Sequence, residues 1–385
     1  MNFAFSNGHI ATKDGLISGG AQIEKGRIAR IGDVTSGDFD LEGGYLLPGF
    51  IDTQVNGGGG VLFNDDTSAA AIAAIGAAHR PYGTTGFLPT LISDELEVID
   101  AAMRATEEAI AQGVPGVLGI HIEGPFISEQ RKGIHDPEKF RRLTEDSVKL
   151  LSSLKRGKTL VTLAPEHARP EFIQSLKAAG VVIAAGHTDA TYAQARSGID
   201  SGITGVTHLF NAMSPLGHRA PGVVGAALED QSIYCGIIVD GHHVSEPALR
   251  IALRTKPYDR FMLVTDAMPT VGSDNKQFTL MGKHIIAKDG VCVGPDGTLA
   301  GSDLDMATAV RNTVRTLDVS LADASVMASY APARFMGLSD DYGQLHTGAR
   351  ADLVWLDKNL AVRGVWINGE GGPVRQRPPR RSAPT

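Results

Sequence analysis

Cysteine is scarce in this chain, which has only Cys235 and Cys292 and no CxxC pair. Two isolated thiols exclude a disulfide framework and predict a protein of the reducing cytoplasm. The first residues, MNFAFSNGHIATKDG, lack a basic start followed by an apolar core, so no secretory signal is predicted. Long apolar runs are also missing, since none approaches the ~18 residues that a membrane helix needs. We therefore expect a cytoplasmic protein with no membrane partner.

An excess of positive charge is missing as well. The formal net charge is −7 at pH 7, which argues against nucleic acid as the main partner. A small anionic substrate stays possible, because nearby donors and a metal outweigh a distant net charge. The chain does have length and apolar content, with 385 residues, 42% of them hydrophobic and 21% charged. These values predict a globular protein with room for a barrel of about 250 residues and a smaller domain.

Both ends of the chain carry short alternating segments separated by glycine turns. Residues 1–45 include NGHIATKDG and AQIEKGRIARIGD, and residues 343–372 include GARADLVWLDKNLAVRGVWING. Such alternation is typical of antiparallel hairpins. We expect one small β-sandwich domain that is formed by both chain termini. Residues 373–385 are rich in proline and arginine without periodicity, and we expect them to be a mobile tail.

The middle of the chain, residues 46–342, has a different pattern. Its apolar runs are hydrophobic along their whole length and alternate with helix-like segments, which indicates parallel strands that are buried on both faces. Eight strands are the number that closes a (β/α)8 TIM-like barrel, in the α/β class. The expected strands are 46–52, 85–91, 117–122, 160–164, 181–186, 203–208, 235–239 and 261–265. The expected helices are 69–82, 94–112, 140–154, 172–179, 190–198 and 246–254, with 306–317 and 321–336 outside the barrel.

Four chemically active residues close or follow these runs: Glu123, His187, His208 and Asp266. Because the C-terminal ends of barrel strands share one rim, we expect the four side chains to meet. One carboxylate and two imidazoles are what a catalytic divalent metal needs while one position stays open for water. Asp266 can take a proton from such a metal-activated water and later give it to the leaving group.

Each of these residues alone also has an ordinary explanation. A histidine at a strand end is more often a hydrogen-bonded structural residue. Glu123 in the sequence EGP suits a turn, and Asp266 in TDAMP suits a cap. The coincidence of four such residues on one rim favours the metal site.

A loop rich in glycine and proline, SPLGHRAPGVVG, follows the motif THLFNAM. Backbone N–H groups of such a loop can hold an anion, and Arg219 adds a charged fork that suits phosphate. The alternative is a flexible loop with a solvated arginine. In DGHHV, adjacent histidines point to opposite sides of an extended segment, so one of them can face the site. His135 in KGIHDPE lies in a loop after the third strand, and a lone histidine in a loop is usually a bystander.

The motifs together resemble a known family. They run from PGFIDTQVNGGGG through HIEGPF, KGIHDP, GHT, THLFNAMSP, DGHHV, TDAMP and LAGS to ARADLVWLD. At these residues the chain is similar, over nearly its whole length, to the N-acetylglucosamine-6-phosphate deacetylases of the amidohydrolase superfamily. The resemblance implies metal-dependent hydrolysis of the acetamide of N-acetylglucosamine 6-phosphate, which yields glucosamine 6-phosphate and acetate.

The same resemblance implies roles for individual residues. Glu123, His187 and His208 match the metal ligands, and Asp266 matches the general base and acid. His243 matches the residue that polarises the acetamide carbonyl. Some substrate contacts in this family come from a neighbouring subunit, so a homodimer or a dimer-based assembly is implied. The positions that match substrate-binding residues are His135, Asn211, Ala212, Arg219, His243, Leu299, Ala300, Gly301 and Ser302.

One departure from the superfamily pattern concerns the metal. Many amidohydrolases place HxH after PGFID, where this chain has Gln54 and Asn56. Neutral amides are poor ligands for transition metals, so we expect a single divalent ion per subunit. Zinc is the first choice, and iron, manganese or cobalt accept the same ligands.

Other functions stay open at this point. The nearest is a different amidohydrolase reaction, such as deacetylation of N-acetylgalactosamine 6-phosphate or hydrolysis of a cyclic amide. A non-catalytic scaffold is the alternative from another class. Such a scaffold would be expected to lose a metal ligand or the base, and this chain keeps all four residues.

Overall fold

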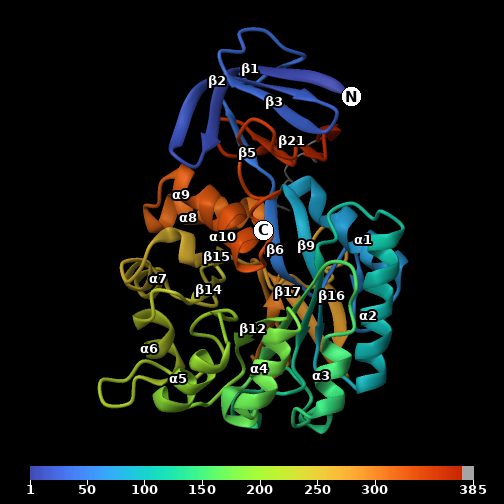
Figure 1. Ribbon diagram of the computed structural model, residues 1–385, viewed down its shortest axis with the longest axis vertical. Helices are drawn as coiled ribbons and strands as arrows, with labels where there is room; N and C mark the ends of the chain where they lie inside the picture. The colour runs from blue at the N-terminus through green and yellow to red at the C-terminus, as the bar shows by residue number, and fades with distance from the viewer. Residues whose placement is uncertain (375–385) are drawn as a thin grey trace, which may run out of the picture.

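A small sheet made from both ends of the chain lies above a barrel in the computed structural model, which describes residues 1–374 (Figure 1). The N-terminal strands of this sheet, drawn in blue, lie beside the C-terminal strands, drawn in red. The sheet has the order β22-β21-β20-β5-β1-β2-β3, with β4 paired to β1. Its strands are β1 (Asn2–Thr12), β2 (Gly15–Glu24), β3 (Arg27–Gly32), β4 (Phe39–Asp40), β5 (Tyr45–Pro48), β20 (Leu353–Leu356), β21 (Val362–Ile367) and β22 (Glu370–Pro373).

Aromatic side chains from both termini fill the interior of this small domain. The ring of Phe5 meets that of Trp366 edge to face, with centroids 4.9 Å apart. Phe3 and Phe39 pack on the same pair. Because a sheet buries one face, the alternation in the sequence places these residues inside. The predicted small β domain from both termini is confirmed, although one continuous curled sheet forms it instead of two separate sheets.

Eight parallel strands form the barrel, as predicted. Each pairs with the next in chain order, and a bridge between Val55 and Ala267 joins the first strand to the segment after the last. Nearly every residue of these strands is buried, which explains why the runs are apolar throughout. The strands are β6 (Phe50–Val55), β9 (Thr84–Ile92), β10 (Gly119–Glu123), β11 (Lys158–Leu163), β12 (Val182–Ala185), β13 (Gly205–Val206), β14 (Tyr234–Ile237) and β15 (Phe261–Leu263).

The chain passes from the small sheet to the barrel at Gly49. The expected strand 46–52 is therefore two strands, because β5 pairs with β1 and β20 while β6 pairs with β9. A Cβ atom at Gly49 would lie 1.9 Å from Oγ1 of Thr85, so only glycine allows this close crossing. At the other end, Val374 still donates its N–H to the carbonyl of Arg363. Of the expected tail, residues 375–385 lie outside the described residues, and the exact domain limits stay a prediction.

Helices cover the outside of the barrel, and hydroxyl or carboxylate caps start several of them. Ser68, Thr144, Thr191 and Asp305 each accept an N–H from the first turn of a helix. No helix within residues 1–374 is long and apolar enough to span a bilayer. The helices are α1 (Ala69–His79), α2 (Leu96–Ala111), α3 (Glu145–Leu151), α4 (Pro170–Ala178), α5 (Tyr192–Ser201), α6 (Gly222–Glu229), α7 (Glu246–Leu253), α8 (Met306–Leu317), α9 (Leu321–Ser325) and α10 (Ala331–Phe335).

Three helical segments differ from the expectation. The helix expected over 140–154 is shorter in the structure. Only α3 forms there, and it begins after the cap residue Thr144. The segment 321–336 is divided by a π-turn over Val326–Tyr330. Helix α6 was not expected at all, since its sequence GVVGAALE is rich in glycine and has no charged face.

A four-stranded antiparallel sheet between β15 and α8 was also not expected. It consists of β16 (Gln277–Leu280), β17 (Lys283–Lys288), β18 (Val291–Val293) and β19 (Leu299–Ser302). A short hairpin of β7 (Gly57–Gly58) and β8 (Val61–Leu62) follows β6. Ser302 forms a bridge with Ala267, which brings the last strand of the inserted sheet to the rim of the barrel.

Asp52 supports the closure of the barrel from its interior. Its Oδ2 accepts the hydroxyl of Thr265 at 2.5 Å, and its Oδ1 accepts the backbone N–H groups of Gln54 and Thr265 at 3.2 and 3.3 Å. Burial raises the pKa of this carboxyl to about 7. The carboxyl group therefore keeps its proton in the folded protein at a pH where an exposed aspartate has lost it.

This shift predicts an unusual dependence of stability on pH. Below pH 4 both the folded and the unfolded carboxyl are protonated, and between about pH 4 and 7 only the folded one is. The free energy of unfolding of the metal-free protein should therefore fall across this window by up to about 1.4 kcal/mol per pH unit relative to Asp52→Asn. Urea unfolding at several pH values measures the difference. The exposed variant Asp33→Asn is the control, and a parallel course of wild type and Asp52→Asn would contradict the prediction.

Candidate active site

The four residues expected to meet do so at the C-terminal ends of the barrel strands. Glu123 is the last residue of β10, and His187 and His208 each lie two residues beyond a strand, β12 and β13. Asp266 follows β15 by three residues. The first three are 2%, 6% and 4% exposed, and Asp266 keeps part of its surface open. The side chains therefore share one enclosed rim.

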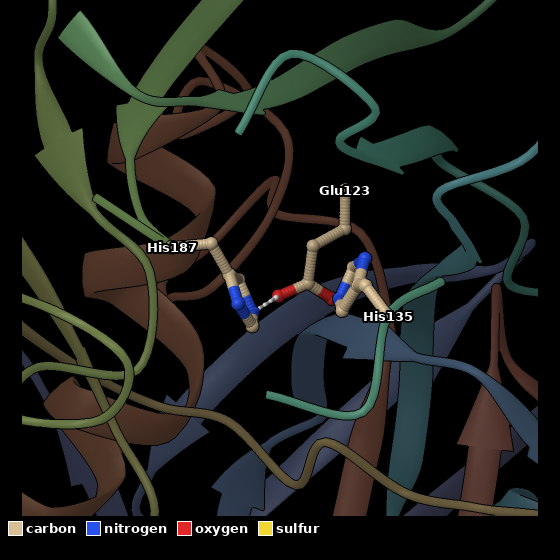
Figure 2. Close-up of side chains that lie close together, drawn as sticks. All are labelled: Glu123, His135 and His187. Atoms are coloured by element: carbon tan, nitrogen blue, oxygen red, sulfur yellow. Dashed lines mark ion pairs between the residues drawn. The ribbon is translucent and has the colours of Figure 1, made fainter. Parts of the chain in front are cut away.

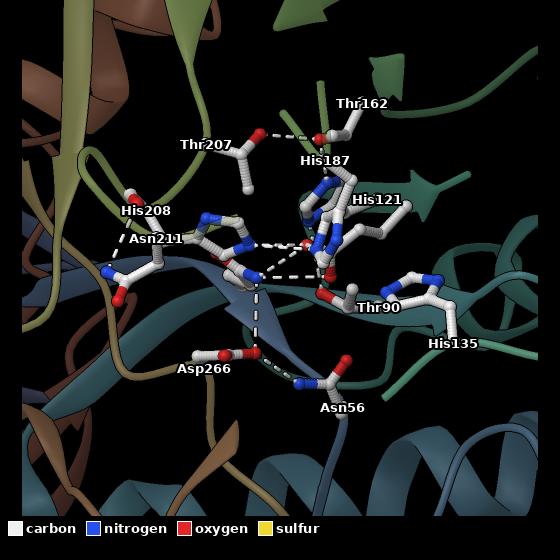
Figure 3. A network of polar contacts seen from close by, with 12 residues as sticks. Asn56, Thr90, His121, His135, Thr162, His187, Thr207, His208, Asn211 and Asp266 are labelled. Carbon is white, nitrogen blue, oxygen red and sulfur yellow. Dashed lines mark hydrogen bonds and ion pairs between the residues drawn. The ribbon is translucent and has the colours of Figure 1, made fainter. Parts of the chain in front are cut away.

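Three potential ligand atoms lie close together, and Figure 3 shows the two imidazoles among them, those of His187 and His208. Nε2 of His208 lies 3.0 Å from Oε1 of Glu123 and 3.1 Å from Nε2 of His187, which in turn lies 3.2 Å from the same oxygen. Ligand atoms about 2.0–2.2 Å from a tetrahedral metal are about 3.3–3.5 Å apart. The trio is close to this spacing, so its donor set and its geometry fit one divalent cation.

The backbone of the loop after β10 orients His187. Nδ1 of His187 donates to the carbonyl oxygen of Arg131 at 2.9 Å, and the N–H of Ser128 donates to the carbonyl of His187 at 2.8 Å. With its proton on Nδ1, the imidazole leaves the lone pair of Nε2 free for a metal. The guanidinium of Arg131 also pairs with Asp189 at 2.8 Å, which fixes the loop beside the site.

A second trio near the same carboxylate includes His135 instead of His208 (Figure 2). One ligand atom each of Glu123, His135 and His187 lie within 4.8 Å of one another. Nδ1 of His135, however, lies 2.7 Å from the hydroxyl of Ser93 and accepts its N–H at 3.3 Å. The spacing of 3.0–3.2 Å in the trio with His208 is tighter, so that trio is the better ligand set.

Two amides tie the two carboxylates of the site together. Nε2 of Gln54 lies 3.1 Å from both oxygens of Glu123 and 3.1 Å from Oδ1 of Asp266. Nδ2 of Asn56 donates to the same Oδ1 at 2.7 Å. The sequence indicated only that these residues are poor metal ligands. In the structure their N–H groups donate to the carboxylates of Glu123 and Asp266. They thereby stabilise the negative charge that a second metal ion would otherwise balance.

The two carboxyl groups have different proton affinities. Burial pushes the pKa of Glu123 upward, but hydrogen bonds from His187 and His208 outweigh it and hold the pKa well below the usual value. Burial and the charge of Glu123 raise the pKa of Asp266 to about 6. Glu123 is therefore ionised at neutral pH, while Asp266 can accept and return a proton.

A cavity of about 360 Å³ opens above these groups. Nδ1 of His243 at its wall lies 2.6 Å from the carboxylate of Asp240, which orients the imidazole. The sequence did not single out several of the lining residues, which are Ile92, Gln130, Arg131, Gly133, Ile134, Met268 and Thr298. The expected site residues that line the cavity are Glu123, His135, His187, His208, Asn211, Ala212, His243, Asp266, Leu299 and Gly301.

Known proteins with this pattern share the whole fold. The model of the amidohydrolase family matches residues 45–371. This chain belongs to the amidohydrolase family. The chain is 42% identical to an N-acetylgalactosamine-6-phosphate deacetylase of Shewanella sp. (strain ANA-3), over 94% of this chain and 90% of that protein. It is 36% identical to an N-acetylglucosamine-6-phosphate deacetylase of Haemophilus influenzae, over 96% and 99% of the two chains.

A solved structure supports the same relation. The crystal structure of the N-acetylglucosamine-6-phosphate deacetylase from Pasteurella multocida matches with a TM-score of 0.93 and 34% identity, over 97% of this chain and 100% of that one. The expected membership in the amidohydrolase superfamily is thus confirmed, together with the barrel and the small β domain.

Three expected substrate contacts of this amidohydrolase lie outside the cavity. Arg219 is in an exposed loop and does not line it. Ala300 and Ser302 are fully buried, because alternate residues of β19 point to opposite sides while Leu299 and Gly301 face the cavity. Ser302 instead donates its N–H to the carbonyl of Asp266 at 2.9 Å. It therefore holds the backbone of the site, and its role as a substrate contact stays a prediction.

The position of Gln54 predicts a large effect on stability. Gln54→Leu removes the side-chain amide that contacts both Glu123 and Asp266, so both carboxylates lose a donor. The free energy of unfolding of the metal-free protein should fall by about 2–4 kcal/mol, measured by urea unfolding. Gln112→Leu is the matched control, since its amide donates to Glu108 on the exposed face of α2. Equal effects of the two substitutions would contradict the bridging role of Gln54.

Proposed function

We propose that this amidohydrolase removes the acetyl group from N-acetylglucosamine 6-phosphate and releases glucosamine 6-phosphate and acetate. The convergence of Glu123, His187 and His208 beside the carboxylate of Asp266 carries the proposal. The cavity of about 360 Å³ has the size of a small-ligand site. Two relatives by sequence and one matching crystal structure bear the names of deacetylases of phosphorylated amino sugars.

Glu123, His187 and His208 are the proposed ligands of one divalent metal ion. Zinc suits two imidazoles and one carboxylate, and iron, manganese or cobalt accept the same set. When bound, the ion acts as a Lewis acid and lowers the pKa of water. The amides of Gln54 and Asn56 occupy the space between Glu123 and Asp266, which supports a single ion.

Asp266 is the proposed general base and acid. Its Oδ1 accepts the N–H groups of Gln54 and Asn56, so Oδ2 is the oxygen left to exchange a proton. With a pKa raised to about 6, the carboxylate can take a proton from the attacking water and then pass it to the leaving amine. This residue therefore serves both halves of the hydrolysis.

His243 is the proposed donor to the acetamide oxygen. Its Nδ1 is held by Asp240, so the other ring nitrogen stays available at the cavity wall. Negative charge grows on the carbonyl oxygen during the attack, and the loss of one such donor in other enzymes costs about 2.7–4 kcal/mol. His135, which also lines the cavity, is the proposed sugar contact, and Asn211 and Ala212 are the proposed phosphate contacts.

We also propose a homodimer or a dimer-based assembly in the cytoplasm. Arg219 lies in an exposed loop and does not line the cavity of its own chain, which supports a role for it in a partner's phosphate site. Two free, buried cysteines, Cys235 and Cys292, suit a reducing compartment.

A substrate panel tests the proposed reaction. Acetate release should be fastest, by kcat/KM, with N-acetylglucosamine 6-phosphate. The C4 epimer is included because one relative is named for N-acetylgalactosamine 6-phosphate. The unphosphorylated sugar and a cyclic amide complete the panel, and both should be poor substrates. A higher kcat/KM for the epimer would reassign the substrate, and no acetate from any phosphorylated sugar would refute the deacetylase function.

Substitution of Asp266 separates metal binding from turnover. Asp266→Asn keeps an oxygen that can accept the amides of Gln54 and Asn56, but it cannot carry a proton. We expect one tightly bound divalent ion per chain in both proteins and a kcat about 10²–10⁴-fold lower in the variant. Metal analysis and acetate release measure the two quantities, with the exposed Asp296→Asn as control. Near-normal turnover would exclude Asp266 as the base, and two tightly held ions would exclude the single-metal site.

A further inference from the structure

A layer of polar side chains crosses the barrel interior directly behind the candidate ligands (Figure 3). Buried polar groups in a barrel are costly unless each finds a partner, so a whole layer of them calls for a physical reason. The layer consists of Thr90 on β9, His121 on β10, Thr162 on β11 and Thr207 just after β13, which are 0%, 1%, 0% and 6% exposed.

Hydrogen bonds connect the four side chains of this layer one after another into a hydrogen-bonded chain. Nε2 of His121 lies 2.8 Å from Oγ1 of Thr162, which lies 2.6 Å from Oγ1 of Thr207. On the other side, Nδ1 of His121 lies 3.4 Å from Oγ1 of Thr90. A neutral imidazole offers one donor and one acceptor, so His121 can be the centre of the chain and join both arms.

Each arm of the chain ends next to a residue of the candidate site. His121 is two residues before Glu123 on the same strand, so both side chains point to the same face of β10. Thr207 directly precedes His208. Thr90 accepts the N–H of Val55 at 2.8 Å, and Val55 follows Gln54. A shift of His121 would therefore move strands that carry separate parts of the site.

His208 has an unsatisfied group on this side. Within the described residues, its Nδ1 is buried and has no hydrogen-bond partner. A cavity of about 10 Å³, room for about one water, has Thr53, Gln54, His121, Thr207 and His208 as its polar lining, and apolar residues of the barrel interior form the rest of its wall. A histidine that binds a metal usually donates its second N–H to a carboxylate, a carbonyl or a water. The polar layer borders the place where such a partner of His208 would lie.

We propose that His121 is a positioning residue that holds Glu123 and His208 in the geometry of the metal site, with one buried water as its link to His208. The inference rests on the proposed metal-dependent function. It assigns the Thr90–His121–Thr162–Thr207 chain a role in metal affinity, beyond its contribution to packing. A purely structural layer would affect the stability of the metal-free protein and leave the affinity for metal unchanged.

Zinc affinity of the full-length protein, measured by competition with a chromophoric chelator, tests the proposal. His121→Leu removes both hydrogen bonds, and its dissociation constant for Zn²⁺ should rise about 10–100-fold. His121→Gln keeps a donor and an acceptor and should restore most of the affinity. Urea unfolding of each metal-free variant shows whether the loss of affinity exceeds any loss of stability.

A second pair of variants covers the case in which His121→Leu does not fold. Thr162→Val removes the hydroxyl that joins His121 to Thr207 while keeping the side-chain shape, and it should weaken zinc binding about tenfold. Thr313→Val is the matched control, because this equally buried hydroxyl donates only to Ala309 within α8. Its affinity for zinc should stay within twofold of wild type.

The outcomes separate this proposal from the proposed function. Zinc dissociation constants within twofold of wild type for His121→Leu and Thr162→Val would overturn the positioning role while the deacetylase function stands. A wild-type protein that binds none of Zn²⁺, Fe²⁺, Mn²⁺ and Co²⁺ would overturn both. A crystal structure of the zinc-bound protein should show an ordered water at Nδ1 of His208, and a direct protein contact there would overturn the water link.

Discussion

The closure of the barrel between β6 and the segment after β15 is the constraint on which the rest of the structure depends. Val55 pairs with Ala267, and the N–H of Asp266 donates to the carbonyl of Gln54 at 3.1 Å. The same junction that completes the ring therefore sets the amide of Gln54 against Asp266. Because the first and last barrel strands are more than 200 residues apart in the chain, only the closed fold creates this part of the site.

The junction between β6 and the segment after β15 also determines how the negative charges of the site are stabilised. Glu123 is buried and Asp266 is partly buried, and two isolated negative charges in such a place would be very costly. The imidazoles of His187 and His208 stabilise Glu123, while the amides of Gln54 and Asn56 stabilise Asp266. The unequal partners push the pKa values of the two carboxyl groups apart, which gives one chain both a permanent anion and a proton carrier.

The backbone of the site is held in a conformation that side chains seldom adopt. His187, His208 and Asp266 have φ values of 48°, 31° and 53°, and residues other than glycine rarely have positive φ. Such positions cost about 1–3 kcal/mol each and persist where surrounding contacts enforce them. Ser128 holds the carbonyl of His187, and Ser302 holds that of Asp266. The turn after each strand thereby directs a side chain toward the rim, and the inserted sheet that carries Ser302 helps to support it.

The amino-acid sequence by itself determined the barrel, the small β domain and the meeting of Glu123, His187, His208 and Asp266, because continuous apolar runs and strand-end positions are local patterns. Tertiary structure decided what depends on contacts between distant segments: the bridging role of Gln54, the sheet over 277–302, and the burial of Ser302. It also left Arg219 out of the lining of the cavity in its own chain. A local pattern states which residues end a strand, but the partner of each side chain is set only when the barrel closes, since packing and hydrogen bonding then join residues that the sequence keeps far apart.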